Sequence, residues 1–169
     1  MTGVVGDLPL RDTARGLVLD PEDRLLLIQY EAAIDVDPAR PGLRAFWFTP
    51  GGGVEPGETH EQALRRELEE EIGVRNIAVG PWLSYREKPF LLFRKQHFIR
   101  ERHYLVRLPS AAIDTSRLAE TEDNPVLDVR WWSMAELEDA TEVIEPRGFI
   151  ELTRRIVAGE VPKNPVTLS

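Results

Sequence analysis

A glycine-rich loop that leads into an acidic helix constrains the fold of this chain more than any other feature. The glycines at 51–53 are followed by Pro56 and Gly57. Glycine and proline at this density interrupt regular structure, so we predict a loop without helix or strand. Immediately afterwards, Thr59 suits a helix N-cap and Gly73 suits a C-terminal stop. The rest of the chain must fold around this loop and helix.

The predicted helix has two different faces, because each residue turns it by about 100°. Its apolar stripe, which should face the core, consists of Leu64, Leu68 and Ile72. An adjacent acidic face gathers Glu67, Glu70 and Glu71. A solvated charged face is the ordinary interpretation, but like charges three and four residues apart repel one another. Converging carboxylates are what a hard divalent cation such as Mg²⁺ requires.

Three other loop motifs fail on spacing. No Gly-Lys-Ser/Thr follows the glycines, so the loop is not a Walker motif. Pro56 stands where a dinucleotide fingerprint needs its third glycine. His60-Glu61 begins like a zinc-protease motif, but the second histidine is missing. A glycine-rich loop at a helix start can still present backbone N–H groups to a phosphate.

The rest of the chain predicts a single α+β domain over residues 1–169, with its core at about 12–160. A turn at 20–23 joins two apolar runs, and a long loop occupies 31–43. Further strands are predicted at 45–49, 77–92, 98–108 and 126–132. Two further helices are predicted at 134–140 and 149–158, and a loose tail at 161–169.

Composition excludes several classes of function. Lys and Arg total 21 against 29 Asp and Glu, and the net charge of -8 argues against a general nucleic-acid surface. The absence of cysteine excludes disulfides, thiolate-bound metals and thiol nucleophiles. Residues 1–10 lack the features of a signal peptide, and the apolar runs are too short for a membrane helix. We therefore expect a cytoplasmic protein without a membrane partner.

The acidic helix and its loop resemble the Nudix box at every defined position. The matching residues are Gly52, Glu58, Arg66-Glu67-Leu68, Glu70-Glu71 and Gly73-Val74. The segments 47–51 and 129–132 also look like this family. The resemblance implies an α/β/α sandwich around a mixed sheet, with the Nudix helix on one side and a C-terminal helix on the other. It also implies hydrolysis of a nucleoside diphosphate linked to another group.

The resemblance also assigns roles by position. It implies that Mg²⁺, or alternatively Mn²⁺, is held by the three glutamates Glu67, Glu70 and Glu71. One of them, or a glutamate outside the box, would deprotonate the attacking water. Arg66 resembles the arginine that orients the first of these glutamates. Gly51 would offer its carbonyl to the metal, and the remaining box positions are structural: Gly52, Glu58 and Gly73.

The basic segment 86–107 is our candidate for the part of the protein that binds the group attached to the nucleoside diphosphate. Its seven cations are Arg86, Lys88, Arg94, Lys95, Arg100, Arg102 and Arg107. In strand alternation Arg100 and Arg102 share a face with Phe98 and Tyr104, which suits a surface that stacks a base and holds phosphates. An ordinary amphipathic strand explains the same pattern equally well. Trp47 is a further candidate for base stacking, or else a core residue.

Three functions follow. The first is a metal-dependent pyrophosphohydrolase that acts on a nucleoside diphosphate derivative such as a nucleotide sugar or ADP-ribose. The second is a pyrophosphatase that releases inorganic pyrophosphate from an NTP or dNTP. The third is a nucleotide-binding Nudix module without turnover, which the intact glutamates disfavour. The expected partner is a small nucleotide, and the exposed aromatic residues permit a homodimer. The acidic composition disfavours an RNA-processing role but does not remove it, because the basic segment is local.

Overall fold

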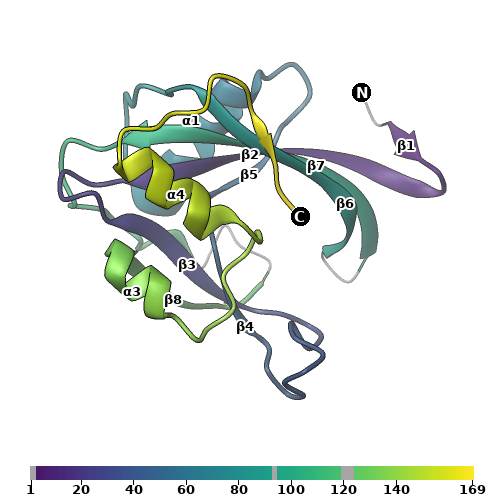
Figure 1. Ribbon diagram of the computed structural model, residues 1–169. Helices are drawn as coiled ribbons and strands as arrows, with labels where there is room; N and C mark the ends of the chain where they lie inside the picture. The colour runs from purple at the N-terminus through teal and green to yellow at the C-terminus, as the bar shows by residue number, and fades with distance from the viewer. Residues whose placement is uncertain (1–2, 93–94, 119–123) are drawn as a thin grey trace.

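A mixed sheet divides into two parts after one hairpin, and helices cover both of its faces (Figure 1). This computed structural model describes residues 3–92, 95–118 and 124–169. Its strands are β1 (Val4–Val5), β2 (Leu8–Leu19), β3 (Leu25–Glu31), β4 (Ala45–Phe48), β5 (Gly51–Gly53), β6 (Trp82–Leu92), β7 (Lys95–Arg107), β8 (Val126–Trp132) and β9 (Val166–Thr167). Its helices are α1 (His60–Ile72), α3 (Met134–Asp139) and α4 (Phe149–Val157).

The two parts of the sheet separate because β2 and β3 pair only where the turn joins them, at Leu19 and Leu25. Beyond that point β2 runs parallel to β7 and antiparallel to β5, while β7 pairs with β6. On the other side, β3 pairs with β4 and β8. The divergence leaves space between the outer strands β4 and β6.

Helix α1 forms as its sequence predicts. The side chain of Thr59 accepts a hydrogen bond from the backbone of Gln62, whose own side chain caps Thr59 in return. Gly73 ends the helix in the left-handed conformation that favours glycine. The apolar stripe packs on the alternate residues of β2 and β7 that face it, Ala14, Val18, Tyr104 and Val106. This contact fixes the rotation of α1 and therefore the direction of its glutamates.

The opposite face of the sheet is covered by α4 (Figure 1). Leu17 and Leu19 of β2 point to this side and pack with Phe149, Leu152 and Ile156. Because side chains alternate along a strand, β2 supplies both hydrophobic layers at once. The two helices on opposite faces confirm the predicted α/β/α arrangement.

Several predictions of local structure are wrong, and three of them bear on the fold. The glycines at 51–53 are not irregular but form β5, because β2 offers them an antiparallel edge. Residues 77–81 lie outside β6, which begins at Trp82. The tail expected at 161–169 contains β9, which pairs in parallel with β6 at Ser84 and Tyr85. None of the described helices has the length and apolar character needed to cross a membrane.

Candidate active site

Arg66 organises the acidic face of α1. Its guanidinium donates to both carboxylate oxygens of Glu58, at 2.8 and 3.0 Å, and to Glu67 at 2.7 Å. It also donates to the carbonyl of Gly53 and lies 3.8 Å from the carboxylate of Glu70. The hydrogen bond from Arg66 lowers the pKa of Glu58. One arginine thus joins the loop before α1 to the glutamates on the helix.

Glu71 is the buried member of the acidic face. Its Oε2 accepts a hydrogen bond of 2.8 Å from the backbone N–H of Gly51, and its side chain is fully buried. Gly51 has φ +131°, and a Cβ there would lie 2.3 Å from the carbonyl oxygen of Ala14. Only glycine permits this close approach to β2. The Gly51 carbonyl also accepts a hydrogen bond of 3.2 Å from Arg15.

The carboxylate of Glu67 occupies the space where Gly52 has no side chain. A Cβ at position 52 would lie 2.6 Å from Cδ of Glu67 and 2.7 Å from both of its oxygens. The obstructing atoms are the far end of a flexible side chain. Any residue larger than glycine would therefore displace this carboxylate before it disturbed the backbone.

We expect Gly52→Ala to fold normally and to lose turnover about tenfold or more, because small displacements at a reacting centre are costly. The matched control is Gly53→Ala, whose Cβ would instead meet the end of Arg11 at 2.9 Å. Steady-state rates on the same nucleotide, compared with thermal melts, check the prediction. An equal loss in both variants would mean that the position of Glu67 is not critical.

Sequence reasoning missed a buried group of charges that lies beside the loop. Glu101 is 1% exposed and accepts hydrogen bonds of 2.7 Å from both Arg15 and Arg86. Burial alone would raise the pKa of Glu101, but these two arginines bring it well below its ordinary value. Arg15 also donates to the carbonyl of Thr49 and packs over the ring of Phe48. This group connects β5, at Gly51, with β6 and β7.

The signal that could have found this group is strand alternation. The residues of β7 that alternate with the predicted basic face are Ile99, Glu101, His103 and Leu105, and all four are buried. A glutamate and a histidine inside such an apolar series require buried partners. Our substrate prediction used only the other face of the strand.

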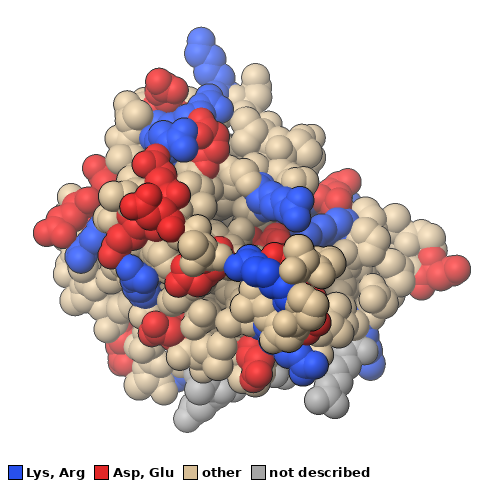
Figure 2. Space-filling model, turned by 60° about the horizontal axis from the view of Figure 1, so that its bottom comes forward, with Lys and Arg blue, Asp and Glu red and all other residues tan. Residues whose placement is uncertain are grey.

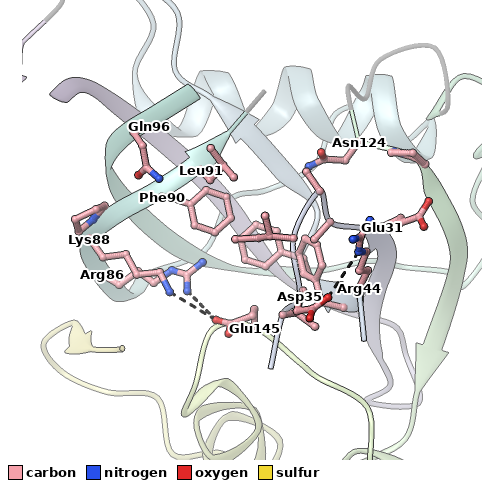
Figure 3. A pocket seen from close by; sticks show the side chains of 18 residues that line it. Glu31, Asp35, Arg44, Arg86, Lys88, Phe90, Leu91, Gln96, Asn124 and Glu145 are labelled. Carbon is pink, nitrogen blue, oxygen red and sulfur yellow. Dashed lines mark hydrogen bonds and ion pairs between the residues drawn. The ribbon is translucent and has the colours of Figure 1, made fainter. Parts of the chain in front are cut away.

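A large cleft opens beside this group, between β6 and the ends of β3 and β4 (Figure 3). Its volume is about 980 Å³, at the upper end of the usual range for ligand sites. Its aromatic wall consists of Phe46, Phe48 and Phe90. Its charged lining includes Glu31, Asp35, Arg44, Arg86, Lys88 and Glu145. Figure 3 shows Glu145 below the opening, facing Arg86 and Lys88.

The charges on this face are mixed. Figure 2 shows the face hollowed near its centre, with basic and acidic side chains both close to the hollow. The view shows no continuous basic field of the kind that attracts a nucleic-acid backbone. This face suits a small charged molecule better than a polyanion.

The predicted substrate residues Arg100, Arg102 and Trp47 do not line this cleft. Arg100 and Arg102 lie on the face of β7 opposite to Glu101, and with Asp12, His60 and Trp82 they line a second, smaller hollow of about 230 Å³. Arg100 is paired with Asp12 at 2.7 Å, and Arg102 lies over the ring of Trp82. Trp47 is 3% exposed in the core under α4. Arg94, which belongs to the basic segment, lies outside the described residues.

The oxygen atoms presented by α1 and Gly51 are chemically suited to bind a divalent cation. It offers three carboxylates on neighbouring turns together with the carbonyl of Gly51, and all of these are hard oxygen ligands. Over residues 3–92, 95–118 and 124–169, no three carboxylate or imidazole groups already converge on one point. A cation would therefore have to compete with Arg66 for Glu67.

Comparison with known proteins agrees with this architecture. The chain is 60% identical over 38 residues to the nucleoside triphosphatase NudI of Enterobacter sp. (strain 638), covering 21% of this chain and 27% of that protein. It is 39% identical over 61 residues to the 8-oxo-dGTP diphosphatase of Proteus vulgaris, covering 36% and 48%. The matches thus span less than half the length of these curated relatives.

A solved structure extends the likeness over most of the fold. The MutT protein from Methanosarcina mazei Go1 has a TM-score of 0.62 at 18% identity, and the match covers 92% of this chain and 98% of that one. In addition, a family model described as the NUDIX domain matches residues 9–153. That match contains the loop, helix α1, the buried charges and the cleft. The chain therefore belongs to the Nudix family.

Proposed function

We propose that this protein is a divalent-metal-dependent pyrophosphohydrolase that cleaves the diphosphate linkage of a nucleoside diphosphate derivative. The observation that carries the proposal is the position of the acidic helix. Its buried Glu71 accepts a hydrogen bond from the backbone N–H of Gly51. The carbonyl of Gly51 accepts one from Arg15, which belongs to the buried charges beside the cleft. These hydrogen bonds link the acidic helix to the charges beside the cleft.

The glutamates Glu67, Glu70 and Glu71, with the carbonyl of Gly51, would hold Mg²⁺ or Mn²⁺. When bound, the cation neutralises the pyrophosphate oxygens and lowers the pKa of a coordinated water, which prepares it to attack phosphorus. Arg66 is a positioning residue here, because it holds Glu67 and Glu58 in a fixed relation through charge-assisted hydrogen bonds. The second phosphate then leaves with the attached group.

The cleft supports a substrate with a sizeable attached group. Its volume accommodates more than a pyrophosphate, and the half-buried Phe90, backed by the buried Phe46 and Phe48, offers apolar surface to a base or a sugar. Its charged lining can hydrogen-bond the polar edges of such a group. Arg86 and Lys88 therefore join Arg100 and Arg102 as our candidates for substrate contact.

The names of the curated relatives favour a second candidate, an NTP or dNTP pyrophosphatase. One relative is named a nucleoside triphosphatase and another an 8-oxo-dGTP diphosphatase. The two activities differ in their products. A triphosphate would yield inorganic pyrophosphate and a nucleoside monophosphate, whereas a diphosphate derivative would yield two organic phosphates.

Turnover should require the cation. We expect hydrolysis of at least one compound in a panel of nucleotide sugars, ADP-ribose, NTPs and dNTPs with Mg²⁺ or Mn²⁺, and none in excess chelator. Mass spectrometry of the products separates the two candidate activities. At ten times its dissociation constant, Mg²⁺ should raise the melting temperature by about 3 to 6 °C, because it binds the folded state. Undiminished turnover with chelator would contradict the proposal.

A further inference from the structure

Arg86 has a hydrogen-bonding group that the described protein does not use. The side chain is 1% exposed, its Nε donates to Glu101 at 2.7 Å and its Nη1 donates to Glu145 at 3.0 Å. Among the described residues, Nη2 finds no hydrogen-bond partner although it is buried. A buried guanidinium donor without an acceptor is costly, so a position like this calls for an acceptor from outside the chain.

The direction of Arg86 indicates where such an acceptor would come from. The residue lines the cleft, and its guanidinium carbon lies 5.3 Å from the ring centre of Phe48 on the cleft wall. Figure 3 shows the Arg86 guanidinium at the edge of the opening, between Lys88 and Glu145. The Arg86 side chain, although almost fully buried, belongs to the lining beside Phe90 and Glu145.

The charge around Arg86 favours an anion. The charges at this end of the cleft comprise four cations, Arg15, Arg86, Lys88 and Arg147, against three carboxylates, Glu71, Glu101 and Glu145. His103 also lies against Glu101, and burial lowers the pKa of its imidazole, so it adds no charge near neutral pH. The count leaves one positive charge in excess, which a phosphate oxygen would neutralise.

We propose that Arg86 binds a phosphate oxygen of the substrate through Nη2, and this inference rests on the proposed pyrophosphohydrolase function. A guanidinium is suited to phosphate because it offers several donors in one plane. The placement also fits the reaction. From Arg86, hydrogen bonds run through Glu101 and Arg15 to the carbonyl of Gly51, which the proposed function makes a metal ligand. The phenylalanines are left for the base or sugar.

The test measures binding without turnover, so that it does not depend on the hydrolytic activity. The four common nucleoside 5′-monophosphates and their nucleosides are titrated into metal-free protein by calorimetry. For the base that the cleft prefers, the parent should bind the monophosphate about tenfold or more tightly than the nucleoside, the scale of one charge-assisted hydrogen bond. Inorganic phosphate serves as the probe for simple anion binding.

Two variants should shift this preference in opposite directions. Arg86→Lys keeps the charge beside Glu101 but removes the planar donors, so the monophosphate preference should fall at least fivefold. Glu145→Gln removes a neighbouring negative charge at a quarter-exposed position, so the monophosphate should bind about two- to fivefold more tightly. Glu160→Gln, an exposed site outside the cleft, is the matched control and should change nothing.

Opposite shifts cannot come from general unfolding, which weakens binding in both variants. Equal losses of nucleoside and monophosphate in Arg86→Lys would show that Arg86 contacts the base or sugar and would overturn the proposal. Monophosphate binding that is no tighter than that of inorganic phosphate would also overturn it. Failure of the proposed function would appear differently, as normal monophosphate binding by a protein that hydrolyses nothing in the substrate panel.

Discussion

Replacing Glu70 by glutamine is expected to lower turnover by about two to three orders of magnitude, the scale seen when one charge-stabilising group at a reacting centre is lost. The side chain of Glu70 is one-third exposed, and its only ion pair among the described contacts is the long one with Arg66, at 3.8 Å. Its removal should therefore alter the free energy of unfolding by about 0.5 kcal/mol or less. A neutral amide is a poorer ligand for a hard cation.

The matched control is Glu69→Gln, on the same helix and with the same change of charge. Glu69 is exposed, pairs with Arg75 and points away from the acidic face. Turnover and the Mg²⁺-induced rise in melting temperature should stay normal in Glu69→Gln, and the rise should be much smaller in Glu70→Gln. A sodium chloride control corrects for ionic strength. Equal Mg²⁺ shifts in both variants would place the cation on other residues.

Helix α1 was predictable because its determinants are local. The cap at Thr59, the stop at Gly73 and the apolar stripe act within a few residues of one another, and the structure confirms all three. The Nudix motif then supplied the fold around it. Even the pair between Arg66 and Glu67 follows from two adjacent positions of that motif.

The parts that could not be predicted depend on distant partners. Gly51–Gly53 forms a strand only because β2 offers an edge to pair with, and β9 exists only because β6 is within reach. Both pairing strands lie far away in the sequence, so the residues around 51–53 and 166–167 do not reveal them. Arg100 and Arg102 share a face as strand alternation predicts, but alternation does not tell which face adjoins the cleft. That depends on where β4 and the loop at Glu145 come to lie.

Glu101 should make the largest single contribution to stability among the buried charges. Glu101→Gln is expected to lower the free energy of unfolding by about 3 to 5 kcal/mol at pH 7, because it leaves Arg15 and Arg86 buried without their shared carboxylate. Urea unfolding followed by circular dichroism measures the loss. The control Glu87→Gln, exposed on β6, should change stability by about 0.5 kcal/mol or less.

The pH dependence of this loss separates a buried ion group from a simple packing defect. The folded-state pKa of Glu101 is well below its unfolded value, so the carboxylate stabilises the protein fully above the unfolded pKa. That stabilisation is lost as the pH falls through the folded pKa. The gap between parent and Glu101→Gln should therefore be constant near neutrality and shrink in acid. A packing defect would leave the gap independent of pH.

A double-mutant cycle with Arg86 completes the test. When Arg86→Gln has already removed one cation, replacing Glu101 leaves only Arg15 buried without its carboxylate. The double variant should therefore lose less stability than the two single losses added together. Residues in direct contact typically show coupling of about 0.5 to 3 kcal/mol, and the 2.7 Å hydrogen bond places this pair among them. Additive losses would mean that the ion pair with Arg15 alone stabilises the buried carboxylate of Glu101. In that case Arg86 would be held mainly by Glu145, and the edge of the cleft would be free to move independently of the loop that holds Glu71.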